Sequence, residues 1–175
     1  MSHSKDNISQ NAQTDKIKVL FVCLGNICRS PAAEGIMKRM IEKNHLENEI
    51  EVDSAGTSGW HQGELPDARM RMHGEKRGYD FNSRSRKISS SDLNQFDYII
   101  VMDNNNHKNV KSLASTPEEA NKIHMMTDFS RQITGHKHVP DPYYGESDGF
   151  ELVMDLLEDA CEGLLQTIIK EHNLQ

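Results

Sequence analysis

The chain has 175 residues, of which 35% are hydrophobic and 27% are charged, and its formal net charge is −7. This length predicts one domain with a substantial core, and the acidic balance argues against nucleic acid as the main partner because a phosphate backbone requires a basic surface. No stretch approaches the about 18 apolar residues of a membrane span and the N-terminus lacks the apolar core of a signal peptide, so we expect neither stable membrane insertion nor secretion.

Residues 1–16 contain few apolar side chains, Met1, Ile8 and Ala12, and these follow no period. A segment of this kind buries too little apolar surface to offset the entropy lost on ordering, so we expect a disordered N-terminal tail. Residues 17–175 hold the periodic patterns and are predicted to form a single domain.

The first predicted element is a strand at residues 17–22, a β-branched and aromatic run typical of a buried parallel strand. After a loop, Ser30 and Pro31 predict the start of a helix, with Ser30 as the capping residue and Pro31 in the first turn. Apolar residues then recur at helical spacing along one stripe, at Ala33, Ile36, Met37, Met40 and Ile41.

Strands and helices alternate through the rest of the chain. Strand patterns occupy residues 50–56, 98–102 and 123–126, and helix patterns occupy residues 66–77, 105–113, a short segment after Thr116 and a long segment after Asp148. Asp148 and Glu151 have the spacing of a capping box at the start of that last helix. Residues 139–145 are predicted to be a loop because two prolines prevent regular pairing.

This alternation predicts an α/β fold in which helices cover both faces of an open parallel sheet. In such folds, ligands bind beyond the carboxyl ends of the strands. Cys23 and Ser54 each lie at such a strand end, so we expect them at the same edge of the sheet.

The main candidate site is the segment between the first strand and the first helix. Its sequence is Cys23-Leu24-Gly25-Asn26-Ile27-Cys28-Arg29-Ser30, with the spacing C-x5-R-S. A loop of this length can turn successive backbone N–H groups inward around an anion, and the helix behind it adds positive potential. Gly25 and Asn26 tolerate the backbone geometry required, and Arg29 offers a planar fork to two phosphate oxygens. The segment therefore predicts a phosphate-binding loop.

Cys23 is the predicted nucleophile of this loop. The helix N-terminus, Arg29 and the Ser30 hydroxyl all favour its thiolate form. Taken alone, Cys23 would be interpreted as a small buried packing residue, and the surrounding motif outweighs that interpretation. A nucleotide-binding loop would need a Gly-Lys-Ser/Thr element and a zinc site would need a second ligand pair, so we expect neither a cofactor nor a metal ion.

Displacement of an alkoxide or phenoxide from phosphorus requires a proton donor to the leaving oxygen. Asp141 is the candidate because Pro140 and Pro142 hold it on a stiff loop. The neighbouring Tyr143 and Tyr144 could be ordinary packing residues, but beside an anion site they would form the walls of a slot for a flat ring.

Together these residues closely resemble the low-molecular-weight protein tyrosine phosphatases over nearly all of residues 17–170. The similar segments are Cys23 to Pro31, Ser54-Ala55-Gly56-Thr57, Trp60-His61-x-Gly63, Phe96 to Asp103 and Asp141-Pro142-Tyr143-Tyr144-Gly145. The resemblance implies a three-layer fold with a central four-stranded parallel sheet and a phosphocysteine intermediate on Cys23. It further implies that Arg29 and the loop amides hold phosphate, and that Asp141 acts first as general acid and then as the base that activates water.

The resemblance also implies two supporting groups of residues. Asn26, Ser30 and Ser54 would form a hydrogen-bond network that shapes the loop, and Trp60, Tyr143 and Tyr144 would line an aromatic entrance. Many family members carry a histidine in this network where Ser83 stands here. The basic cluster at residues 84–87 is interpreted as a solvated surface segment.

Substrate class and redox behaviour can be addressed from the cysteines and from one loop residue. In the related arginine phosphatases, the residue that corresponds to Ile27 resembles a threonine, whose hydroxyl helps to select the polar guanidinium phosphate. The apolar side chain of Ile27 favours an aromatic ester instead. The resemblance suggests that Cys28 captures an oxidised Cys23 as a disulfide, although Cys28 could also be an inert packing residue. Cys161 lies on the apolar stripe of the last helix and is predicted to pack in the core. Residues 29–160 contain no cysteine, which excludes an arsenate reductase with relay cysteines.

We therefore expect an enzyme that hydrolyses phosphotyrosine in proteins and in small aryl phosphates. Two alternatives stay open: a phosphatase of the same fold acting on phosphoarginine or a small phosphoester, and a non-catalytic module that binds phosphopeptides. Three cysteines are few and odd in number for a disulfide scaffold, which favours a reducing, cytoplasmic compartment.

Overall fold

The computed structural model describes residues 15–174 of the chain. The tail expected at residues 1–16 falls almost wholly outside these described residues. Within them, no helix combines the length and the apolar character needed to cross a bilayer.

The centre of the fold is a four-stranded parallel sheet, which confirms the predicted fold class. Its strands are β1 (Ile17–Cys23), β2 (Ile50–Gly56), β3 (Tyr98–Val101) and β4 (Ile123–Met125), in the spatial order β2-β1-β3-β4. The chain therefore leaves β1 toward one side and later returns to its other side. Such a reversal of strand order opens a crevice at the carboxyl end of the central strand, where loops can gather around a ligand.

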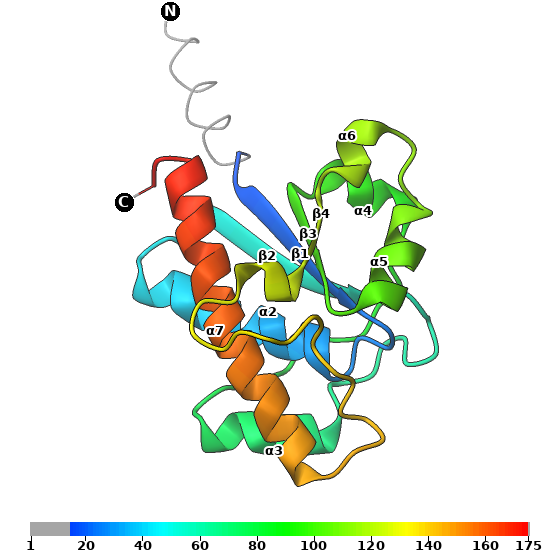
Figure 1. Cartoon of the computed structure of the whole chain (residues 1–175), viewed down its shortest axis with the longest axis vertical. Helices are drawn as coiled ribbons and strands as arrows, with labels where there is room; N and C mark the ends of the chain where they lie inside the picture. Colours follow the sequence, from blue (N-terminus) through cyan, green and yellow to red (C-terminus); the bar gives the residue numbers. More distant parts are fainter. Residues whose placement is uncertain (1–14, 175) are drawn as a thin grey trace, which may run out of the picture.

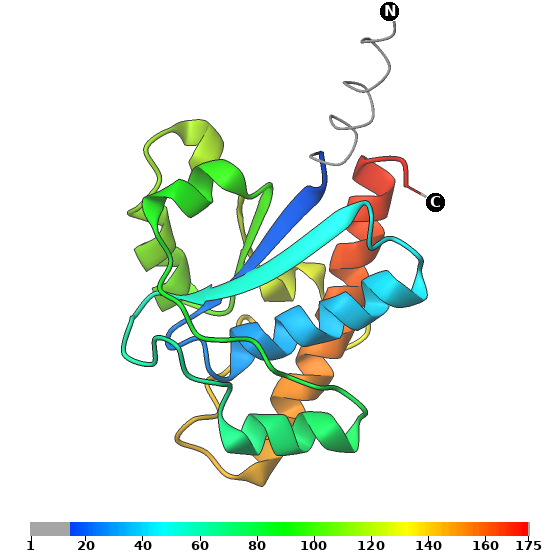
Figure 2. The same ribbon diagram turned by 180° about the vertical axis from the view of Figure 1, so that it is seen from behind.

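Helices cover both faces of this sheet, as the alternation of elements predicts (Figures 1 and 2). One face is covered by α2 (Arg29–Lys43), α7 (Ser147–Glu171) and the short 3-10 helix η1 (Met126–Phe129). The other face is covered by α4 (Ser90–Gln95), α5 (Asn104–Lys111) and α6 (Pro117–Ala120). The remaining helix, α3 (Ala68–Lys76), packs against α7. The three layers of the predicted architecture are thus present.

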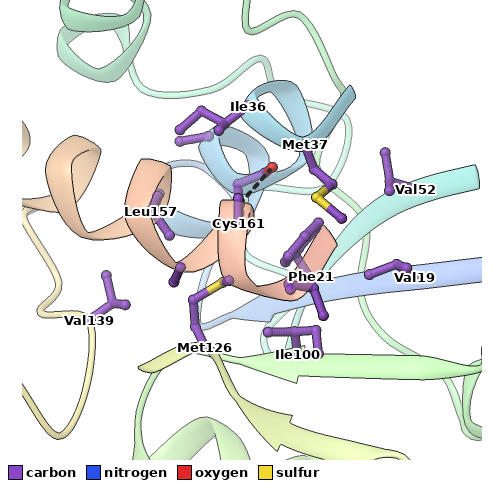
Figure 3. Close-up of a cluster of buried hydrophobic side chains, with 14 of the residues drawn as sticks. Val19, Phe21, Ile36, Met37, Val52, Ile100, Met126, Val139, Leu157 and Cys161 are labelled. Carbon is purple, nitrogen blue, oxygen red and sulfur yellow. Dashed lines mark hydrogen bonds between the residues drawn. The ribbon is translucent and has the colours of Figure 1, made fainter. Parts of the chain in front are cut away.

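The central strand β1 serves both cores because successive side chains of a strand point to opposite faces. Phe21 belongs to the core under α2 and α7, whereas Leu20 and Val22 belong to the core on the other face. Figure 3 shows Phe21 close to Met37 of α2 and Cys161 of α7. Burial of a phenylalanine of this kind contributes about 1.5–3 kcal/mol. This packing fixes the end of β1, where the candidate loop begins.

Two predicted helix caps are wrong. Helix α2 begins at Arg29, with Cys28 in the capping position and no side-chain cap, because the Ser30 hydroxyl instead lies 3.0 Å from Cys23 Sγ. Helix α7 begins at Ser147 rather than at Asp148, and no side chain caps it. Glu151 turns away from the helix start because it pairs with His73 and Arg77 of the α3 region.

Helix α4 is an element that the sequence patterns did not reveal. It has six residues, too few to show an apolar stripe. Its signal was local: the Asp92 carboxylate accepts the Ser89 backbone N–H at 2.8 Å, the Ser-x-x-Asp variant of a capping box.

Candidate active site

A cavity of about 180 Å³ opens at the carboxyl end of β1. It is lined by Cys23, Leu24, Gly25, Ile27, Cys28, Arg29, Ser58, Trp60, His61, Asp141, Tyr143 and Tyr144. Trp60 and Tyr144 stand at its rim, with exposed fractions of 91% and 89%. The fold thus brings the predicted loop, the predicted acid and the predicted aromatic residues to one cavity.

The loop from Cys23 to Arg29 depends on two special backbone positions. Asn26 is buried with φ at +55°, the left-handed region that asparagine tolerates better than most residues. Gly56, at the end of β2, lies so close to the loop that a Cβ there would be 2.8 Å from the carbonyl oxygen of Leu24. A glycine at that strand end therefore allows the loop to pack against the sheet.

Asn26 is the centre of a buried hydrogen-bond network. Its amide nitrogen donates to Ser30 Oγ at 2.7 Å and to Ser54 Oγ at 2.9 Å, and its Oδ1 accepts the backbone N–H of Arg86 at 3.0 Å. Ser54 Oγ donates in turn to Glu34 Oε1 at 2.6 Å. The network joins the three residues that the resemblance implied and extends to Glu34, which sequence reasoning missed.

The sulfur of Cys23 faces two groups of Ser30. The Ser30 hydroxyl oxygen lies 3.0 Å from Sγ, and the Ser30 backbone N–H donates to Sγ at 3.4 Å. The same hydroxyl accepts a hydrogen bond from Asn26, and its own proton is shared between the sulfur at 3.0 Å and the carbonyl oxygen of Ala55 at 3.3 Å. Donors aimed at a sulfur stabilise negative charge there.

Arg29 is almost fully buried, with an exposed fraction of 2%. Its Nη1 lies 2.7 Å from Asp103 Oδ2 and donates to the carbonyl oxygen of Val139 at 3.0 Å. Burial alone would lower the pKa of Arg29, but Cys23, the hydrogen bond to Asp103 and nearby Asp141 together raise it above its usual value. The guanidinium is therefore held as a fixed cation, and Asp103, which no sequence argument assigned, helps to orient it.

The loop that carries Asp141 is anchored in the core at one end. Val139 is fully buried and its N–H donates to the carbonyl oxygen of Met102 at 2.8 Å. Asp141 Oδ1 accepts the Tyr143 N–H at 3.0 Å, and Oδ2 lies 3.5 Å from Arg29 Nη2. This bonding directs the carboxylate toward the cavity.

A second anchor of the same loop comes from α3 and was missed by sequence reasoning. Arg69 binds Asp67 through contacts of 3.0 and 2.9 Å, and its Nη2 donates to the carbonyl oxygen of Tyr143 at 3.0 Å. The Asp67 backbone N–H donates to the carbonyl oxygen of Ile27 at 2.8 Å. The hydrogen bond from Arg69 also lowers the pKa of Asp67. This pair thus connects the Cys23 loop with the Asp141 loop.

The interpretation of residues 84–87 as a solvated cluster is wrong for its two central residues. Ser85 is buried and its Oγ donates to the carbonyl oxygen of Gly25 at 3.1 Å. Arg86 forms ion pairs of 3.0 Å with Asp53 and with Asp92. Ser83 forms no side-chain hydrogen bond within residues 15–174, so Ser85 and Arg86 support the loop instead.

The three cysteines are buried and free. Burial, followed by the nearby charge of Asp67, raises the pKa of Cys28 well above its usual value, so Cys28 is held as a thiol although it lines the cavity. Cys161 packs in the core as predicted, with Sγ 3.8 Å from the carbonyl oxygen of Ala33 (Figure 3). Within the described residues, no group of three or more His, Cys, Asp or Glu side chains is arranged to hold a metal ion.

Comparison with known proteins identifies the family. The model of the family described as low molecular weight phosphotyrosine protein phosphatase matches residues 18–174. The low molecular weight protein-tyrosine-phosphatase YfkJ of Bacillus subtilis is 42% identical over 90% of this chain and 99% of its own. A protein tyrosine phosphatase structure from Entamoeba histolytica is 48% identical with a TM-score of 0.86, covering 91% of this chain and 100% of that chain. A Drosophila arginine phosphatase structure is 36% identical with a TM-score of 0.79, covering 87% and 98%. The chain belongs to the low molecular weight phosphotyrosine protein phosphatase family.

Proposed function

We propose that this protein hydrolyses phosphotyrosine in proteins, and small aryl phosphates, through a phosphocysteine intermediate on Cys23. The observation that supports this proposal best is the convergence of Cys23, Arg29 and Asp141 on one cavity. We assign the whole activity to a single domain over residues 17–175. Since the nucleophile is a thiolate, a reducing, cytoplasmic compartment suits the reaction.

The first step transfers the phosphoryl group to the protein. The phosphate dianion binds the loop N–H groups, the N-terminus of α2 and the Arg29 guanidinium. The Cys23 thiolate attacks phosphorus, the bond between phosphorus and the phenolic oxygen breaks, and Asp141 gives its proton to that oxygen. Tyrosine leaves, and Asp141 is left as a carboxylate.

The second step returns the enzyme to its initial state. The Asp141 carboxylate takes a proton from water as that water attacks phosphorus. The bond between phosphorus and sulfur breaks, inorganic phosphate leaves, and the Cys23 thiolate is regained. The Ser30 hydroxyl, 3.0 Å from Sγ, stabilises this leaving thiolate. Each proton transfer is assigned to a protein group, so the proposed cycle uses no metal ion or other cofactor.

The rim of the cavity supports an aromatic substrate. Tyr143 and Tyr144 present two rings whose centroids are 4.9 Å apart and nearly perpendicular, at 82°. With Trp60 they form apolar walls above the phosphate site, and a flat phenyl ring is the complementary shape. Cys23 at the floor would then be reached by a phosphate carried on a long aromatic side chain.

The test is hydrolysis of p-nitrophenyl phosphate in the presence of a metal chelator. We expect turnover by the unmodified protein and none by Cys23→Ser. Cys161→Ala is the matched control, because it removes a cysteine thiol outside the cavity and should retain activity. Equal rates for Cys23→Ser and the unmodified protein would overturn the mechanism, and phosphopeptide binding without turnover by the unmodified protein would favour the non-catalytic module.

Phosphoarginine is the second candidate substrate, because the Drosophila arginine phosphatase structure is among the similar ones. The apolar Ile27 lines the cavity and favours the aromatic ester over the polar guanidinium. Comparison of kcat/KM for phosphotyrosine and phosphoarginine separates the two. A preference for phosphoarginine by the unmodified protein would replace phosphotyrosine as the substrate while leaving the cysteine mechanism intact.

A further inference from the structure

A second, shallower hollow of about 540 Å³ lies beside the cavity and shares Ile27, His61 and Tyr143 with it. We call this hollow the side groove. Its outer part includes Arg71 of α3 and Arg84 of the segment that follows α3. Because the two hollows share a wall, a peptide whose phosphotyrosine enters the cavity is placed to extend along the side groove.

The acidic and the basic side chains of the side groove differ in whether they have partners within the protein. Of its two carboxylates, Asp67 is ion-paired with Arg69, and Glu64 is hydrogen-bonded to His61. Its two arginines have no such partner: across residues 15–174, neither Arg71 nor Arg84 lies within ion-pair distance of a carboxylate. The side groove therefore carries two unpaired arginine charges against the single carboxylate of Glu64, a local excess of positive charge on a chain whose net charge is −7.

Both arginines are oriented by backbone carbonyl groups. Arg71 is half-buried, and its Nε donates to the carbonyl oxygen of Pro66 at 3.0 Å. Arg84 is exposed, and its Nη1 donates to the carbonyl oxygen of Gly63 at 3.2 Å. Each guanidinium thus keeps further N–H groups for an incoming acceptor. The planar fork of arginine matches the geometry of a carboxylate.

We propose that the side groove is a subsite for an acidic side chain, aspartate or glutamate, that flanks the phosphotyrosine of a substrate protein. This inference rests on the proposed function and specifies its substrate class. The subsite contacts a part of the substrate that is remote from the reacting phosphorus. Its contribution therefore appears mainly in KM, because such contacts are equally strong before and during the chemical step.

The experiment compares three phosphotyrosine peptides. The first has glutamates on the N-terminal side of the phosphotyrosine, the second has glutamates on its C-terminal side, and the third has alanines at all these positions. At low ionic strength, we expect kcat/KM to favour a glutamate peptide by roughly three- to tenfold, the effect of one or two exposed ion pairs. The preference should shrink as salt is added, because exposed charges are screened. A preference on either side supports the subsite.

The variants are Arg71→Ala combined with Arg84→Ala, and Arg84→Ala alone. The double variant should lose the preference for glutamate peptides, and the single variant should lose part of it. In both variants, the rate of hydrolysis of p-nitrophenyl phosphate should stay unchanged. Because Arg84 is exposed, the single variant keeps the test available if the double variant is unstable. The matched control is Arg131→Ala, which removes the same charge from an arginine that pairs with Glu162 outside both hollows.

The outcomes separate this inference from the function on which it rests. If the unmodified protein hydrolyses p-nitrophenyl phosphate but treats the three peptides alike, the subsite is wrong and the phosphatase function stands. The same holds if the glutamate preference survives in both arginine variants, or disappears equally in Arg131→Ala. If the unmodified protein hydrolyses none of these compounds, the proposed function fails and the subsite fails with it.

Discussion

Asp141 Oδ2 lies 3.5 Å from Arg29 Nη2, so the predicted acid and the predicted phosphate ligand are in contact within one cavity. The other terminal nitrogen of Arg29 is held by Asp103 and by the carbonyl oxygen of Val139. Among residues 15–174, Asp141 is the group that a phosphate bound to Nη2 would displace. The arrival of the phosphate would free the carboxyl group for the leaving oxygen, which joins substrate binding to the positioning of the acid.

The role of Asp141 predicts a dependence on the leaving group. Asp141→Ala should lower kcat for phosphotyrosine roughly 100-fold or more, because a poor leaving group needs the donated proton. Aryl phosphates with acidic phenols, which leave without a proton, should be affected much less. Steady-state rates across a series of aryl phosphates measure this trend. A uniform effect across the series would remove Asp141 from the role of general acid.

Arg69 is expected to act through Asp141 rather than on the substrate. Arg69→Ala removes the bond to the carbonyl oxygen of Tyr143, and we expect kcat for phosphotyrosine to fall roughly tenfold because the acid is less well placed. The informative measurement is the same substitution made in Asp141→Ala. A positioning residue should have little further effect on kcat there, and Arg69→Lys should restore only part of the activity. A full tenfold loss in both backgrounds would show that Arg69 acts independently of the acid.

Cys28 is expected to protect the nucleophile from permanent oxidation. Peroxide converts the Cys23 thiolate to a sulfenic acid, and the Cys28 thiol then attacks that sulfur, releasing water and forming a disulfide. Both cysteines line the cavity, and Cys28 gives up the proton that its raised pKa retains as its sulfur attacks, so that this proton leaves with the sulfenic oxygen as water. After brief peroxide treatment, dithiothreitol should restore most activity to the unmodified protein and to Cys161→Ala, but little to Cys28→Ser. Full recovery of Cys28→Ser would contradict this role.

Asp92 predicts a pH-dependent contribution to stability. Burial raises the pKa of Asp92, but hydrogen bonds from Arg86 and from the Ser89 backbone outweigh it and hold the pKa below its usual value. Such a carboxylate stabilises the folded chain above about pH 4, and this contribution is lost as the pH falls through the lower, folded-state value. Asp92→Asn should therefore lower the free energy of unfolding by about 1–2 kcal/mol at pH 7 and by less at pH 3.

Urea unfolding at the two pH values measures this difference. The control is Asp80→Asn, since Asp80 is exposed and, among the described residues, accepts a single hydrogen bond, from the Asn82 side chain at 3.2 Å. It should change the free energy of unfolding little at either pH. An equal loss in Asp92→Asn at pH 7 and pH 3 would show that the carboxylate charge does not matter.

Much of the fold could be predicted because its signals are local. The apolar run at residues 17–22 and the stripe of the last helix reflect the periods of a strand and a helix, and the structure has β1 and α7 there. The two capping predictions failed because the Ser30 hydroxyl turns to Cys23 within its own loop, and because Glu151 pairs with His73 and Arg77, which are far away in the sequence. Local spacing describes which bonds a side chain can form, whereas the packed fold decides which bond it forms.

The sequence by itself determined the predicted nucleophile, phosphate ligand and acid of this protein. Cys23 and Arg29 lie on one short loop whose chemistry is contained in its own spacing, and Asp141 is marked by the prolines beside it. Only the tertiary structure decided what holds them: Asp103 on Arg29, Arg69 on the Asp141 loop, and Ser85 and Arg86 beneath Asn26. Within residues 15–174, it also left Arg71 and Arg84 without an ion-pair partner beside the cavity, while Asp67 nearby is paired with Arg69. The physical reason is that an ion pair or hydrogen bond depends on distance in space, and no local pattern records which distant residues will meet.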